Sequence, residues 1–169
     1  MRLVFVLIAT AVWAVTGCAL AQSVEIRGPG GKTRLVSLSD LASMPHDTAT
    51  LAVEHGLAKH YRGVPLTLLL QSVGAPVGKD LRGPALADFV LVSAADGYRV
   101  VLALAETDPG LGARKVLLAD SADGAPLPPS EGPFRLVVEG DLRPARSARM
   151  VTTIRVDARC GLRSSRAVR

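Results

Sequence analysis

The sequence has little cysteine and few aromatic residues. Cysteine occurs only as Cys18 and Cys160, too few for a disulfide framework or for a metal site built from paired cysteines. With three Phe, two Tyr and one Trp, no aromatic platform is interleaved with the basic residues, which argues against nucleic-acid binding. The chain also lacks the Gly-x-Ser-x-Gly, His-Glu-x-x-His and phosphate-loop patterns, so no standard hydrolase, zinc-protease or nucleotide motif is present.

The N-terminus has the pattern of an export signal. Arg2 supplies a positive charge, residues 3–15 form an apolar stretch, and Ala19-Leu20-Ala21 places small residues where signal peptidase cuts. The stretch is shorter than the roughly 20 apolar residues that a membrane-spanning helix needs. We therefore expect residues 1–21 to be a cleaved signal peptide and the product to be periplasmic or secreted. The alternative is a lipoprotein anchored through Cys18, because residues 15–18 resemble a lipobox.

The remaining chain is expected to form one domain, residues 22–157, followed by a basic tail, residues 158–169. Eight arginines fall between Arg143 and Arg169, with Asp157 as the only acid there. Such a tail suits an anionic surface or an acidic partner, although solvated arginines are the simpler interpretation. No apolar run after residue 21 is long enough to cross a membrane. The expected partners are a small anionic ligand or a periplasmic protein.

Short apolar runs separated by turn residues predict a β-rich α+β domain. Asp96-Gly97 between two apolar runs is a strong hairpin signal, and the continuity of both runs predicts a hairpin buried on both faces. Two helices are expected, a short one that Ser39 caps and that runs through Met44, and a longer one from Pro65 to Gly74. The expected strands are residues 23–26, 33–38, 48–53, 89–92, 98–104, 116–119, 134–138 and 150–156.

Several short motifs follow one another in order along the chain. They are Tyr61-Arg62-Gly63-Val64-Pro65-Leu66, Leu68-Leu69-Leu70 with Gly74, Asp96-Gly97-Tyr98, Leu117-Leu118-Ala119-Asp120, Asp123-Gly124 with Pro126-Leu127-Pro128, and Gly132-Pro133-Phe134-Arg135-Leu136-Val137. This series resembles the oxidoreductase molybdopterin-binding domain, the fold of sulfite-oxidase-type enzymes, over roughly Thr48 to Val156. The resemblance implies a mixed α+β domain that, in catalytic members, holds a pterin pyrophosphate and a molybdenum atom.

One element of the family pattern is missing. Catalytic members supply a cysteine thiolate to molybdenum from the loop before the Gly-Val-Pro-Leu segment, and residues 53–61 contain no cysteine here. His55 and His60 are the candidate metal ligands in its place, although a neutral imidazole is a different ligand from a thiolate and two histidines at this spacing match no defined site. Surface histidines without a metal are the alternative interpretation.

Two functions follow from the resemblance. The first is an exported binding or accessory module that keeps the fold without molybdenum–thiolate chemistry. The second is a periplasmic molybdopterin-dependent oxidoreductase with a metal ligand other than cysteine. In either case Arg62, Arg99, Arg135 and Tyr98 are the candidate cofactor-binding residues. The cofactor is unknown: molybdopterin stays open as a ligand, whereas the missing thiolate argues against molybdenum.

Overall fold

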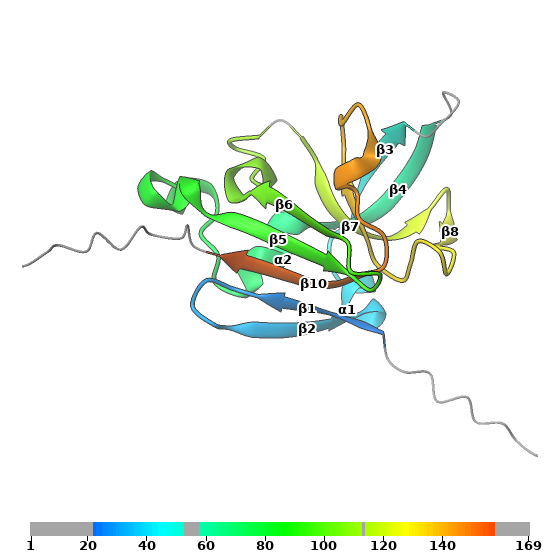
Figure 1. Ribbon diagram of the computed structural model, residues 1–169, viewed down its shortest axis with the longest axis horizontal. Coiled ribbons are helices and arrows are strands. Elements are labelled where there is room, and N and C mark those ends of the chain that lie inside the picture. Colours follow the sequence, from blue (N-terminus) through cyan, green and yellow to red (C-terminus); the bar gives the residue numbers. More distant parts are fainter. Residues whose placement is uncertain (1–21, 53–57, 113, 158–169) are drawn as a thin grey trace, which may run out of the picture.

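The computed structural model describes residues 22–52, 58–112 and 114–157. These residues form two five-stranded sheets, a short helix at the end of the first hairpin and a second helix between the sheets (Figure 1). The predicted α+β class is confirmed. The helices are α1 (Leu38–Ala42) and α2 (Leu66–Ser72), with 3-10 turns η2 (Gly78–Asp80), η3 (Gly83–Ala87), η4 (Leu104–Thr107) and η5 (Pro144–Arg146).

The first sheet, sheet A, has the strand order β2-β1-β10-β5-β6. The last strand of the domain, β10, inserts between the first hairpin and the β5–β6 hairpin, pairing parallel with β1 and antiparallel with β5. The two ends of the domain are therefore tied together by backbone hydrogen bonds. The strands are β1 (Ser23–Arg27), β2 (Thr33–Ser37), β5 (Phe89–Ala94), β6 (Arg99–Ala103) and β10 (Val151–Asp157).

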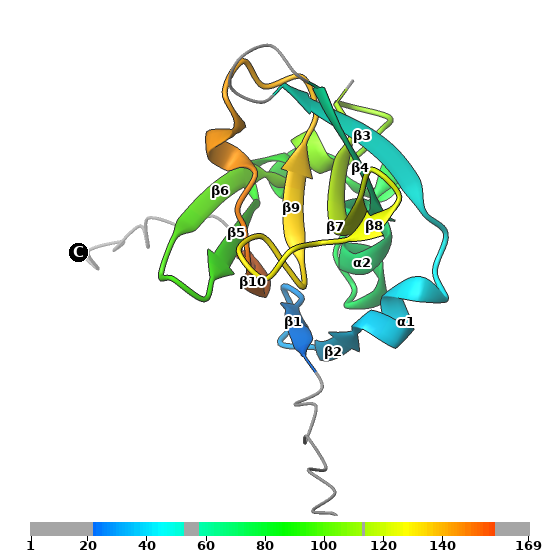
Figure 2. The same cartoon turned by 90° about the vertical axis from the view of Figure 1, so that its right-hand side faces the viewer.

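The second sheet, sheet B, has the order β3-β4-β7-β8, and β9 lies off this path and pairs with β7 (Figure 2). All of its pairings are antiparallel. The register between β4 and β7 shifts because Arg62 and Gly63 oppose Ser121 and Ala119, which leaves Asp120 as the extra residue of a β-bulge. The strands are β3 (Asp47–Ala52), β4 (Ala58–Pro65), β7 (Val116–Ala122), β8 (Ala125–Pro126) and β9 (Arg135–Val138).

The main core lies between the two sheets. Leu66, Leu69 and Leu70 of α2 are fully buried there with the inward side chains of both sheets. Sheet B also buries its other face, because strand residues alternate between faces and both sets are apolar. We call this second group the outer cluster; it consists of Ala49, Leu51, Tyr61, Leu117, Ala119, Ala122 and Val137.

Most predicted elements are present, and three expectations are wrong. Ser37, not Ser39, caps α1: its hydroxyl accepts from Asp40 N–H, and the Asp40 carboxylate accepts from Ser37 N–H. The β5–β6 hairpin is buried on one face only, with Val101 54% exposed. Residues 58–61 belong to β4 and not to a loop.

Candidate functional site

The structure places the predicted cofactor-binding residues on different surfaces. Arg62 of β4 is exposed, and Arg99 of β6 is exposed on the other sheet. Tyr98, just before β6, is 47% exposed, and its hydroxyl donates to the Ala145 carbonyl at 2.8 Å. Arg135 of β9 is 4% exposed. The four side chains therefore do not form one site.

Of the two histidines predicted as metal ligands, one lies among the described residues. His60 lies on β4, where its Nδ1 is 3.1 Å from the Thr50 hydroxyl on the neighbouring strand. His55 lies outside the described residues. Within those residues, no group of three or more His, Cys, Asp and Glu side chains is arranged to hold a metal ion.

Arg135 instead belongs to a buried polar cluster at the edge of the outer cluster, which we call the Glu131 cluster. The Glu131 carboxylate accepts from Arg135 Nη1 at 2.6 Å, from the Tyr61 hydroxyl at 3.1 Å and from Lys59 Nζ at 3.1 Å. The Arg135 guanidinium also stacks on the Tyr61 ring, 4.9 Å from its centroid, and Lys59 Nζ lies 5.3 Å from the same ring. Three donors from two strands thus converge on one carboxylate.

The backbone fixes the position of Glu131. Its N–H donates to the Pro128 carbonyl at 2.9 Å in the turn before β9, and its own carbonyl accepts from Met150 N–H at 2.9 Å. Tyr61 and Lys59 project from the same face of β4 because they are two residues apart on a strand. The turn therefore holds the carboxylate over the face of sheet B from which its donors project.

The cluster is charged in its resting state. Burial alone would raise the pKa of Glu131, but the hydrogen bonds and charges of Lys59 and Arg135 outweigh it and hold the pKa below its ordinary value of 4.5. Burial raises the pKa of the Tyr61 hydroxyl. Two cations and one carboxylate leave a net charge of +1. Arg135 Nε is buried without a hydrogen-bond partner among the described residues.

A second polar pair lies beside a cleft. His46 Nδ1 is 2.8 Å from the Met44 carbonyl and Nε2 is 3.0 Å from the carboxylate of Asp120, the bulge residue of β7. The Asp120 side chain is only 15% exposed.

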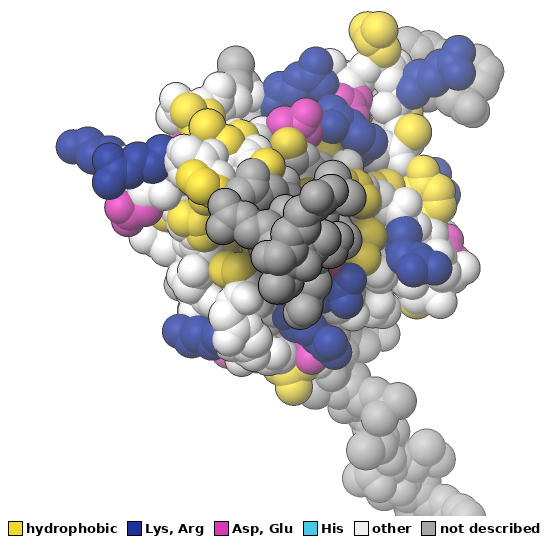
Figure 3. Space-filling model, turned by 60° about the vertical axis from the view of Figure 1, so that its left-hand side comes forward, with side chains coloured by type: hydrophobic (Ala, Val, Ile, Leu, Met, Phe, Trp, Pro, Cys, Tyr) yellow, Lys and Arg dark blue, Asp and Glu magenta, His cyan; other side chains and the backbone are white. Residues whose placement is uncertain are grey.

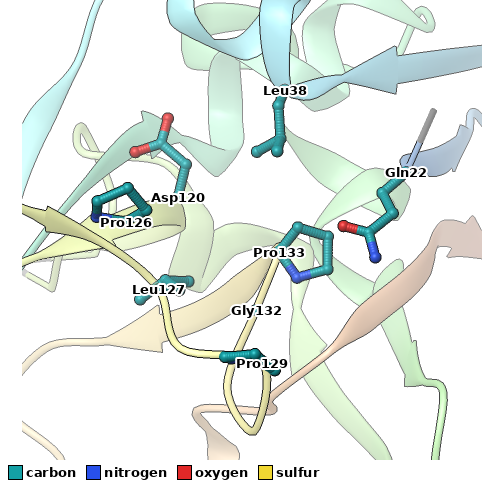
Figure 4. A pocket seen from close by; sticks show the side chains of 8 residues that line it. All are labelled: Gln22, Leu38, Asp120, Pro126, Leu127, Pro129, Gly132 and Pro133. Atoms are coloured by element: carbon teal, nitrogen blue, oxygen red, sulfur yellow. The ribbon is translucent and has the colours of Figure 1, made fainter. Parts of the chain in front are cut away.

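The cleft beside Asp120 has walls made mostly of proline and leucine. Asp120 and Pro126 lie on one side and Gln22 on the opposite side, with Leu38 and Pro133 between them (Figure 4). The Asp120 carboxylate already contacts His46 Nε2 and accepts from the Ser121 hydroxyl, so its polar contacts stabilise the bulge. This pair ties the segment before β3 to the end of β7.

The basic side chains do not gather into one patch on the face that Figure 3 shows. Figure 3 shows Lys and Arg side chains dispersed over the face in view, with Asp and Glu among them. Several arginines are ion-paired, including Arg146 with Asp141 at 2.7 Å and Arg155 with Asp157 at 2.7 Å. No described helix is long and apolar enough to cross a membrane.

Comparisons with known proteins agree with this architecture. The family model of the oxidoreductase molybdopterin binding domain matches residues 19–160, so the chain belongs to that family. Among solved structures, the sulfane dehydrogenase SoxCD from Paracoccus pantotrophus is similar, with a TM-score of 0.60 and 20% sequence identity. The match covers 80% of this chain and 38% of that one, and at this identity it shows the fold alone. A search among curated proteins finds no match.

The described residues do not fit the pterin pyrophosphate that the family implies. A phosphate group at Arg135 would need the same donors that the Glu131 carboxylate now holds. Arg62 cannot join Arg135 in binding one phosphate group. Consecutive residues of β4 point to opposite faces, and Tyr61 faces the Glu131 cluster. Arg99 is on sheet A. Within the Glu131 cluster, Arg135 Nη1, Tyr61 and Lys59 thus already bind a carboxylate of the same chain, and Arg135 Nε has no partner among the described residues.

Sequence reasoning identified Arg135 and missed its partners. Glu131 lies 70 residues from Tyr61 and 72 from Lys59. Its four-residue spacing from Arg135 would indicate a pair on a helix, but Gly132-Pro133 between them predicts a turn. No local pattern therefore marks the cluster.

Proposed function

We propose that this protein is an exported binding or accessory module built on the molybdopterin-domain fold, without molybdenum–thiolate catalysis. The observation that carries the proposal is the Glu131 carboxylate, which occupies Arg135, Tyr61 and Lys59 together. A carboxylate held by two cations at 17% exposure is costly to displace, because a buried cation would lose its partner. The sequence adds that residues 22–159 contain no cysteine to bind the metal.

Such a module functions by binding a partner at its surface or in a cleft. Its partner is a periplasmic protein or a small anionic ligand. The fold alone does not decide function, so the assignment rests on the chemistry of the Glu131 cluster and on the missing thiolate.

The test is cofactor analysis of the protein purified from the periplasm of its native host. We expect no stoichiometric molybdenum, no pterin and no turnover of sulfite or sulfoxides with artificial electron partners. A cysteine-containing family member purified from the same cells is the control, because its cofactor content shows that the host assembles and inserts the group. One pterin and one metal per chain would overturn the accessory function and favour an oxidoreductase with a different metal ligand.

A further inference from the structure

A cleft of about 460 Å³ opens at the end of sheet B farthest from the Glu131 cluster. It lies between the start of α2, the segment after η4 and the first residues of β7. Pro65, which lines it, is six residues along β4 from Lys59, about 20 Å at the rise of an extended strand. The cleft is therefore separate from the Arg135 region, and the inference drawn from it does not depend on the proposed function.

The walls of this cleft are apolar. The apolar side chains that face it are Leu68, which is 39% exposed, Pro109, which is exposed, and Pro65, which is half-buried, whereas Val116 and Leu117 are buried behind them. The two threonine hydroxyls in the lining bond to backbone: Thr67 Oγ1 donates to the Thr107 carbonyl, and Thr107 Oγ1 donates to the Leu104 carbonyl at 2.8 Å. The volume is within the roughly 300–1,000 Å³ of small-molecule sites, which are mostly apolar with a few polar groups.

The charged side chains of the lining carry a net positive charge. They are Arg114, Lys115 and Asp47, two cations and one carboxylate. Lys115 Nζ donates to Asp47 at 2.9 Å and to the Thr48 carbonyl at 3.1 Å, and its side chain is 45% exposed. An exposed pair of this kind is weak, so Lys115 can turn to another anion at little cost.

The Arg114 guanidinium can also bind an anionic group of a ligand. It contacts Asp141 through Nη1, and its side chain is 52% exposed. Asp141 has a second cation, Arg146, which donates from Nε at 2.9 Å and from Nη2 at 2.7 Å. The hydrogen bonds from Arg146 are the largest cause that lowers the pKa of Asp141, so this carboxylate stays charged and paired without Arg114.

We propose that this cleft binds a small amphipathic anion. Its apolar body lies against Leu68, Pro65 and Pro109, and its single carboxylate or sulfonate lies at Arg114 and Lys115. The apolar body supplies most of the binding free energy, and the anionic group supplies orientation and selectivity over a neutral molecule of the same shape.

The test compares two fluorescent probes that share an aromatic skeleton. 8-Anilinonaphthalene-1-sulfonate carries one sulfonate, and N-phenyl-1-naphthylamine is neutral. We expect saturable binding of both to the folded protein, with the sulfonate probe tighter by about threefold to tenfold at low salt and this preference lost at high salt.

Variants locate the site. Leu68→Glu should weaken both probes, whereas the control Leu35→Glu, on a residue of sheet A that is 64% exposed, should change neither. Lys115→Gln should weaken only the sulfonate probe, and Asp47→Asn, which removes the one negative charge of the lining, should tighten it. Near-ultraviolet circular dichroism confirms that each variant is folded. Absent binding, equal affinities for the two probes, or a Leu68→Glu protein that binds like the wild type would overturn the proposal.

Discussion

Replacing Glu131 by Gln removes the charge on which the Glu131 cluster depends and keeps the shape of the side chain. Arg135 is 4% exposed and would lose the one ion pair that it makes among the described residues, while the Gln carbonyl still accepts one hydrogen bond. Breaking a buried ion pair costs about 3–5 kcal/mol, and the retained hydrogen bond returns part of that. We therefore expect a loss of about 2–3 kcal/mol, or about 4–12 °C in the thermal midpoint for a chain of this size.

The assay is thermal and urea unfolding followed by circular dichroism. Glu25→Gln is the matched control, because Glu25 pairs with Arg27 on the surface at 2.7 Å and its loss should leave the midpoint unchanged. The double variant Glu131→Leu with Arg135→Met should recover much of the lost stability, since it removes both charges. A Glu131→Gln protein as stable as the wild type would refute the account of the cluster.

The same pair of proteins has a predicted pH dependence. The pKa of Glu131 is lowered in the folded protein, so its stabilising contribution is complete well above the ordinary value of 4.5 and is lost as the pH falls through the folded value. The stability difference between the wild type and Glu131→Gln should therefore be largest near neutral pH and shrink below about pH 4.5. A difference that grows on acidification would contradict the charged state of the cluster.

Three further predictions concern the backbone and the N-terminus. Gly63→Ala should unfold the domain or cost about 3 kcal/mol or more, because a Cβ there would lie 2.3 Å from the Leu118 carbonyl oxygen, and urea unfolding measures the loss. Gly97→Val should cost about 1–3 kcal/mol, since Gly97 has φ of +85° in the β5–β6 turn, and an unchanged melting curve would contradict that strain. Intact-mass analysis of the soluble periplasmic fraction should show a protein that begins at Gln22. A protein with a lipidated Cys18 would show that the chain is anchored instead.

The fold followed from the sequence where local signals were strong. The Asp96-Gly97 turn has the positive φ that its sequence predicts, and α2 ends in the turn that Gly74 was expected to close. Strand β4 was missed because Lys59, His60 and Arg62 interrupt its apolar pattern, and Gly63 and Pro65 are typical of turns. Its pairing with β3 and β7 decides its structure, and such pairing leaves no local signature.

The error at the β5–β6 hairpin has a related cause. Continuous apolar runs predict strands covered on both faces, but β6 is at the edge of sheet A, where Val101 faces away from the core. The candidate site was less predictable than the fold. Arg135 was identified from its motif. Its partner Glu131 lies in a turn whose position depends on backbone hydrogen bonds with Pro128 and Met150, and these leave no local pattern in the sequence.

The central claim is that Glu131 occupies the donors that a phosphate group would need. Titration calorimetry with inorganic pyrophosphate tests it most directly, comparing the wild type with Glu131→Ala and with Glu131→Ala combined with Arg135→Met. We predict no saturable binding to the wild type, binding to the folded Glu131→Ala protein, and loss of that binding when Arg135 is also replaced. Pyrophosphate binding to the wild type with the affinity of Glu131→Ala would contradict the claim.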